Sequence, residues 1–121
     1  MDFTTLYSMI DSLTEEQLDA LPYGVIQLDA QGTILHYNDY ESELAQLPRA
    51  SVIGKNFFRD VAPCTDVQEF HGRFTEGVAN RRLDVKFRYH FAFAHNPRTV
   101  QVTLFYSAIT SSVWVIVQPV D

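Results

Sequence analysis

The β-rich runs of this sequence fall into two groups, two runs before a helical block and three after it, and this grouping constrains the fold most. The first two runs, residues 24–29 and 33–38, are joined by the Gly-containing turn 30–32, so we expect a hairpin. The later runs are residues 83–93, 99–107 and 112–117, with turns at 95–98 and 109–112. This order predicts an α+β fold, a five-stranded antiparallel sheet with short helices on one face.

A small helical segment precedes the first strand. Thr14 is followed three residues later by Gln17, a capping-box pattern typical of a helix start. Pro22 ends this pattern because its ring cannot continue a helix. We therefore expect an N-terminal helical cap over residues 1–22 and one core domain over residues 23–121.

The helical block lies between the two groups of strands. Strong helix formers predict a helix over residues 39–46, and the irregular stretch 51–66 predicts short helical turns and loop. Residues 67–79 carry apolar side chains near the i, i+3, i+4, i+7 spacing, which predicts a further helix. These apolar residues are Val67, Phe70, Phe74 and Val78.

Composition excludes several classes of protein. With 46% hydrophobic and 20% charged residues among 121, the chain has the composition of a folded domain rather than of a disordered tail. One cysteine cannot form an internal disulfide, and a net charge of −6 argues against nucleic acid as a partner. The N-terminus lacks a cationic region, and the apolar runs are too short to cross a bilayer. We expect no signal peptide, no membrane insertion and a cytoplasmic location.

The single cysteine, Cys64, has three interpretations. It is a small buried hydrophobe, or a catalytic thiol with His71 or His36 as its base, or the attachment point of a ligand bound through sulfur. No nucleophile motif surrounds it, and flanking carboxylates would raise rather than lower the pKa of the thiol. The residues alone leave packing and attachment open and make an enzyme the least favoured of the three.

Tyr37 and Glu41 lie four residues apart across an expected strand-to-helix junction. If the helix starts promptly, both side chains can point the same way. One interpretation is a core tyrosine and a solvated carboxylate. The other is a phenol and a carboxylic acid that converge on a buried acceptor, because an apolar site raises the pKa of a carboxyl group and keeps it protonated.

The histidines and phenylalanines give weaker signals. The four histidines have no metal-ligand spacing, so we expect no metal site. Phe57 and Phe91 are expected in the core, where they would also suit the walls of a pocket for a planar aromatic ligand.

Residues 54–66, which read GKNFFRDVAPCTD, resemble the chromophore-attachment segment of the photoactive yellow protein family, bacterial photoreceptors with a PAS-type fold. The resemblance continues upstream through residues 23–29 and 34–38. Downstream it includes Glu69-Phe70, Gly72, Phe74, Glu76-Gly77-Val78 and the pair Trp114-Val115. It covers nearly everything from residue 18 onward.

The resemblance implies a blue-light receptor that carries p-coumaric acid as a thioester on Cys64. Tyr37 and Glu41 match the family's donors to the buried phenolate, and Pro63 would stiffen the approach to Cys64. Light would isomerise the chromophore from trans to cis, after which the phenolate takes the Glu41 proton. The charge left on Glu41 would then cause partial unfolding of the cap as the signal.

Three residues in the expected pocket depart from the family pattern. Ala45 replaces a threonine that supports the tyrosine, and Leu47 replaces an arginine that lies over the chromophore. Arg49, two residues on, is a candidate replacement for that arginine. His95 stands where a methionine assists thermal return to the dark state. The resemblance therefore implies the pocket chemistry but not the colour or the recovery rate.

The expected partner is a downstream signalling protein, and the expected assembly is a monomer or weak dimer. We expect no enzymatic activity. The alternative function is a PAS interaction or ligand-sensing module without a chromophore, in which Cys64 is merely packed.

Overall fold

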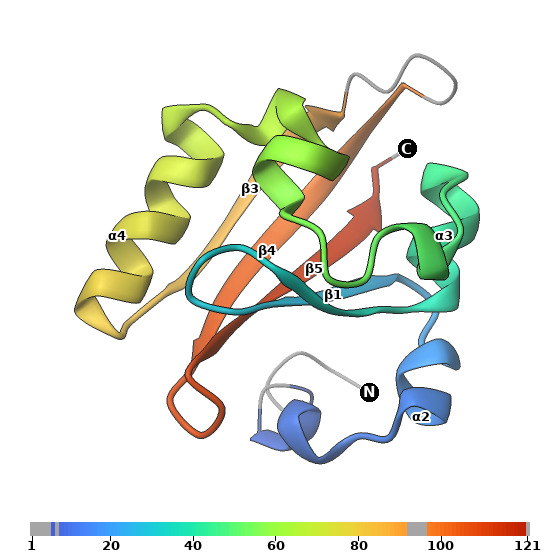
Figure 1. Cartoon of the computed structure of the whole chain (residues 1–121), viewed down its shortest axis with the longest axis horizontal. Coiled ribbons are helices and arrows are strands. Elements are labelled where there is room, and N and C mark those ends of the chain that lie inside the picture. Colours follow the sequence, from blue (N-terminus) through green and yellow to red (C-terminus); the bar gives the residue numbers. More distant parts are fainter. Residues whose placement is uncertain (1–5, 7, 92–96, 121) are drawn as a thin grey trace.

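The computed structural model describes residue 6, residues 8–91 and residues 97–120, and its centre is one antiparallel sheet of five strands. The strand order across the sheet is β2-β1-β5-β4-β3, so the C-terminal strand β5 lies in the middle (Figure 1). The strands are β1 (Gly24–Leu28), β2 (Ile34–Tyr37), β3 (Asp84–Phe91), β4 (Arg98–Ser107) and β5 (Ser112–Pro119). The predicted α+β class and five-stranded sheet are confirmed.

The hairpin between β1 and β2 turns at Gly32, which has a φ of 89°, a conformation that suits glycine. The Oδ1 atom of Asp29 accepts hydrogen bonds from the backbone N–H groups of Gln31 and Thr33, both at 2.9 Å. An aspartate that bonds the backbone two residues on is a common way to close a turn. The expected first hairpin is therefore present.

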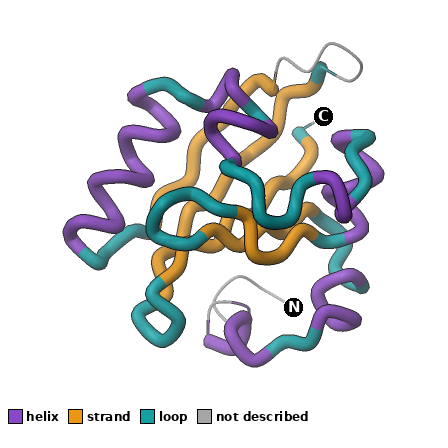
Figure 2. Tube along the Cα trace, in the orientation of Figure 1, coloured by secondary structure: helices purple, strands orange, loops and turns teal. Residues whose placement is uncertain are grey.

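The helices are short and lie between β2 and β3 or before β1. The bounds are η1 (Ile10–Ser12), α2 (Glu15–Asp19), α3 (Asp39–Ala45), η2 (Arg49–Ser51), η3 (Phe57–Val61), η4 (Pro63–Thr65), η5 (Gln68–Gly72) and α4 (Arg73–Asn80). In Figure 2 the loops and short helices between β2 and α4 pass in front of the strands. The predicted capping box is present at the start of α2, where Thr14 and Gln17 bond each other reciprocally.

Two apolar clusters pack on opposite faces of the sheet. Along β5 the side chains alternate, with Val115 in the larger cluster under the helical block and Trp114 in the smaller cluster under the N-terminal segment. The smaller cluster contains Leu6, Ile10, Leu18, Tyr23, Val25, Trp114 and Ile116. The N-terminal segment thus covers the sheet face that the helical block leaves uncovered (Figure 1).

Two expectations about secondary structure were wrong in detail. The single helix over residues 67–79 is a wide turn, η5, followed by α4, because the carbonyl of Val67 accepts from the N–H of Gly72 five residues on. Val67 is consequently 42% exposed instead of lying on the buried helix face. The turn expected at 95–98 ends earlier, since Arg98 is the first residue of β4, and residues 92–96 lie outside the described part of the chain.

Candidate functional site

The centre of the candidate site is the junction of β2 and α3. Tyr37 is the last residue of β2, and Asn38 caps α3 by accepting a hydrogen bond from the Glu41 N–H at 3.1 Å. The helix therefore starts at once, and this brings the buried side chains of Tyr37 and Glu41 together, each 2% exposed. The structure thus favours the convergent arrangement of these two side chains over a solvated carboxylate.

Burial shifts the protonation equilibria of both side chains. Desolvation raises the pKa of Glu41 to about 7, although the Arg98 guanidinium and the Tyr37 hydroxyl act in the opposite direction. Desolvation and the nearby Glu41 raise the pKa of Tyr37 as well. Near neutral pH the pair therefore offers a phenol and a carboxyl group that can still hold its proton.

A glycine on β1 makes room for the carboxyl group of Glu41. A Cβ atom added to Gly24 would lie 2.3 Å from Oε1 of Glu41 and 3.2 Å from its Cβ. Contacts of 2.3 Å are not tolerated between heavy atoms that do not share a bond, so one of the two residues must shift. The absence of a side chain at Gly24 is what lets Glu41 pack against β1.

Replacing Gly24 with alanine is therefore expected to lower the free energy of unfolding by about 1–3 kcal/mol, the usual cost of overpacking a core. Chemical denaturation of the variant measures this value. The same substitution in a Glu41→Ala background should cost less, because Oε1 is gone. An equal cost in both backgrounds would contradict the proposed clash.

Arg98 belongs to this site, although the sequence interpretation placed it in a turn. Its Nη2 atom lies 2.5 Å from Oε2 of Glu41, and its guanidinium carbon lies 5.3 Å from the centre of the Phe91 ring. The sequence does hold a signal for this position, because Arg98, Val100 and Val102 follow one another at every second position of β4, and both valines are buried. Strand periodicity puts all three on the core face of the sheet.

Cys64 lies in the short helix η4, half-buried against the larger apolar cluster. Its backbone carbonyl accepts a hydrogen bond from the Tyr89 hydroxyl of β3. Pro63 precedes it as the first residue of η4, with an exposed side chain, and restricts the backbone there. The thiol-bearing residue is thus held between a proline and a strand.

Aromatic contacts connect Cys64 to Glu41. The rings of Tyr89 and Phe91 have centroids 5.5 Å apart, and Phe91 carries the Arg98 guanidinium that pairs with Glu41. Phe57 joins through Phe70, whose ring centroid is 5.8 Å from that of Phe57 and 5.2 Å from that of Tyr89. One continuous set of contacts between the sheet and the helical block therefore connects the candidate residues Cys64, Phe57, Phe91 and Glu41.

Three other residues that the sequence places in the expected pocket lie in different surroundings or outside the described residues. Ala45 is fully buried in the last turn of α3, and Leu47 packs against the larger apolar cluster. His95 lies outside the described residues.

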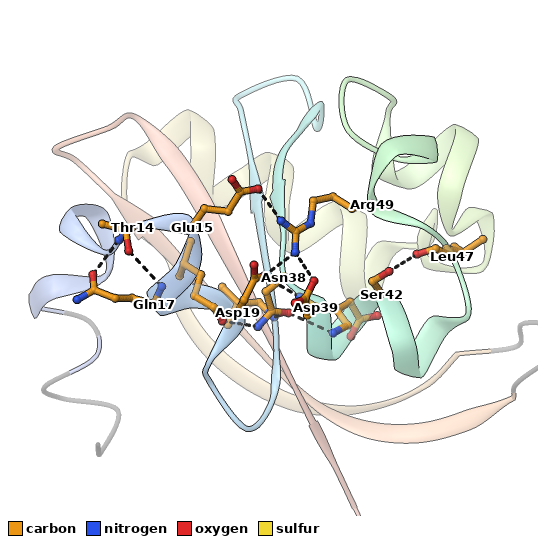
Figure 3. A network of polar contacts seen from close by, with 12 residues as sticks. Thr14, Glu15, Gln17, Asp19, Asn38, Asp39, Ser42, Leu47 and Arg49 are labelled. Atoms are coloured by element: carbon orange, nitrogen blue, oxygen red, sulfur yellow. Dashed lines mark hydrogen bonds and ion pairs between the residues drawn. The ribbon is translucent and has the colours of Figure 1, made fainter.

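Arg49 has partners of its own, away from Glu41. Its guanidinium contacts the carboxylates of Glu15, Asp19 and Asp39 and so joins α2 to the start of α3 (Figure 3). Two of these contacts measure 2.6 Å, to Glu15 and to Asp19. Arg49 is thus part of the junction with the N-terminal segment, and Arg98 is the cation that contacts Glu41.

The histidines considered as bases for Cys64 have other partners. His71 pairs with Asp66 at 2.7 Å and stacks on Phe58 with ring centroids 3.9 Å apart. His36 stacks on Trp114, which belongs to the smaller cluster on the opposite sheet face. Among the described residues, no three His, Cys, Asp or Glu side chains gather where they could hold a metal ion.

Comparison with known proteins identifies relatives over most of the chain. The PAS fold family matches residues 12–118. The photoactive yellow protein of Rhodothalassium salexigens is 48% identical over 106 residues, which is 88% of this chain and 85% of the relative. The photoactive yellow protein of Halochromatium salexigens is 45% identical over 107 residues, 88% of this chain and 86% of the relative.

Solved structures agree with the sequence relatives. The photoactive yellow protein domain of the sensor histidine kinase Ppr from Rhodospirillum centenum superposes with a TM-score of 0.87 at 40% identity, covering 92% of this chain and 97% of that domain. In the described part of the chain, no helix has the length and apolar character needed to cross a membrane. The identities, the coverage and the shared fold together show that the chain belongs to the photoactive yellow protein family of PAS-fold proteins.

Proposed function

We propose that this protein is a blue-light receptor that carries p-coumaric acid as a thioester on Cys64. The observation that carries the proposal is the set of contacts that runs from Cys64 through Tyr89 and Phe91 to Glu41. When bound, the chromophore supplies absorption of blue light and a double bond that isomerises from trans to cis. The family membership of the chain supports the same role.

The residues present fit such a group. Oε1 of Glu41 is buried and has no hydrogen-bond partner among the described residues, so a neutral Glu41 could donate to a buried acceptor. Tyr37 beside it supplies a second O–H donor that stays protonated, and two such donors can stabilise a phenolate that burial would otherwise make costly. Phe57 and Phe91 offer aromatic walls, and Cys64 offers the one thiol of the chain.

Glu41 is the proton donor in this proposal. Loss of its proton leaves a carboxylate with a 3% exposed side chain, and its contact with Arg98 offsets only part of the cost of burying that charge, because burial still raises the pKa of Glu41. A small domain has a total stability of only about 5–15 kcal/mol, so a cost of this size can loosen part of the fold.

The N-terminal segment is joined to the start of the helix that carries Glu41. Asn38, which caps the Glu41 helix, also donates through Nδ2 to the backbone carbonyl of Leu18 at 2.8 Å and to that of Tyr23 at 3.0 Å. The backbone N–H of Asp39 donates to Asp19 at 2.9 Å (Figure 3). We take the proposed cap, residues 1–22, as the element that loosens, because these bonds reach it from the turn that carries Glu41.

The other end of the cap gives a spectroscopic reporter of its docking. Asp11 accepts hydrogen bonds from Nε1 of Trp114 at 2.9 Å, from Ser107 at 2.5 Å and from Thr110 at 3.0 Å. Trp114 is the only tryptophan of the chain and is buried under this segment. Release of the cap should therefore change the fluorescence of the protein.

The proposal is tested by adding activated p-coumarate to the purified protein. We expect a visible absorption band, a mass increase that survives denaturation, and a light-induced change in Trp114 fluorescence. A protein that takes up no chromophore would instead be a PAS interaction or ligand-sensing module, and the proposal would fail. If the protein binds the chromophore but its Trp114 fluorescence does not change on illumination, the attachment to Cys64 stands and the release of the cap is contradicted.

A further inference from the structure

We infer that Arg98 is a positioning residue for the Glu41 proton, because its guanidinium holds the ionised carboxylate and so sets how readily Glu41 gives the proton up. The consequence for a light response rests on the proposed function. The pairing itself belongs to the protein without any chromophore and can be tested there.

The geometry of the pair is that of a desolvated ion pair. Nη2 of Arg98 lies 2.5 Å from Oε2 of Glu41, and the two side chains are 10% and 3% exposed. The guanidinium also lies over the face of Phe91, the residue that pairs with Arg98 in the β3–β4 ladder. Cation–π contact and strand pairing fix where the cation sits, so that it faces one oxygen of Glu41.

Among the residues that the structure describes, few groups compete with Arg98 for influence over Glu41. The described titratable and charged groups facing Glu41 are Arg98 from β4 and Tyr37 from β2, while β1 presents Gly24. Tyr37 is neutral at ordinary pH, since burial and Glu41 both raise its pKa. Arg98 is therefore the charge that opposes the desolvation of Glu41, and it lowers the pKa of Glu41 from the value that burial alone would set.

The pairing has a definite consequence for signalling. A carboxylate that already faces a guanidinium is less costly after proton loss than an isolated buried charge. Arg98 thus makes release of the proton more favourable and lessens the destabilisation that release transmits to the cap.

The test uses the chromophore-free protein with ¹³C-labelled glutamate, in which NMR follows the Glu41 carboxyl through a pH titration and Glu41→Gln assigns its signal. Arg98→Met keeps a long apolar side chain without the charge and should raise the titration midpoint of Glu41 by about one to three pH units. Arg98→Lys should restore much of the lower midpoint. Arg88→Met is the matched control, because it removes an exposed cation from the opposite face of the same sheet and should leave the midpoint unchanged.

A second measurement needs no substitution, in case Arg98→Met does not fold. In the ¹⁵N-arginine-labelled protein, the Arg98 guanidinium signals should shift with the same midpoint as the Glu41 carboxyl. Signals that ignore the Glu41 titration, or a midpoint in Arg98→Met equal to that in Arg88→Met, would overturn the inference. Failure to take up p-coumarate would overturn the proposed function and leave these titrations to decide the role of Arg98 by themselves.

Discussion

Replacing Cys64 with serine or alanine is expected to abolish the visible band and the covalent mass increase completely. Cys64 is the only cysteine in the chain, so no other thiol can form the thioester. The half-buried position of Cys64 beside Tyr89 and the aromatic cluster also means that a replacement leaves the core intact. Absorption spectra and denatured-protein mass spectra after treatment with activated p-coumarate measure the effect.

Two comparisons make this result specific. Circular dichroism of the variants should match that of the parent, which shows that loss of colour is not loss of fold. Pro63→Ala is the matched control, because it changes the neighbouring residue of η4 while keeping the thiol, and it should still form the adduct. A yellow Cys64→Ala protein with the ligand still attached would show that the ligand binds elsewhere and would contradict Cys64 as the attachment site.

The second large effect concerns Glu41 and the pH dependence of stability. Because burial raises the pKa of Glu41 from 4.5 to about 7, the folded state holds this proton more tightly than the unfolded chain does. The resulting stability is complete below about pH 4.5 and is lost as pH rises towards 7. The parent should therefore lose roughly 3 kcal/mol relative to Glu41→Gln across that interval.

Urea denaturation of the parent and of Glu41→Gln, both without chromophore, measures this difference. The series runs from about pH 4 to about pH 8, which includes the pKa of Glu41 in the unfolded chain and in the folded protein. Glu43→Gln is the matched control, since Glu43 is exposed on the same helix and its removal should leave the pH profile of the parent unchanged. Parallel profiles for the parent and Glu41→Gln would show that Glu41 has the same pKa in the folded and unfolded states.

The sequence predicts the strands and most helices because their signals are local. The hairpin turn at Gly32 and the capping box of Thr14 and Gln17 each depend on residues within one turn of the chain. The break between η5 and α4 was missed because apolar spacing at 67–79 fits one helix equally well. The hydrogen bond from the Gly72 N–H to the Val67 carbonyl, five residues back, makes the wide turn η5 instead of a first helical turn. Hydrophobic periodicity carries no information about that bond.

The candidate site was predictable in part for the same reason. Tyr37 and Glu41 are near in sequence, so the prompt start of α3 was enough to bring them together. Arg98 is 57 residues from Glu41, and only the β4 register places it there. Arg49 was considered as a pocket cation because of its neighbours in sequence, whereas its partners in α2 lie 30 and 34 residues away. Long-range ion pairs of this kind depend on packing that one sequence does not display.

The junction of Arg49 with three carboxylates also bears on how this protein tolerates mutation. Glu15, Asp19 and Asp39 carry like charges around one guanidinium, and each surface pair alone contributes no more than about 1 kcal/mol. Loss of one acid removes a partner but also relieves repulsion among the acids, so the two effects partly cancel. Loss of the arginine removes every attraction and leaves the repulsion. Substitution at this junction should therefore have little effect on stability at Glu15 and Asp39. It should cost more at Asp19, which also accepts the Asp39 N–H, and at Arg49, the cation that all three acids share.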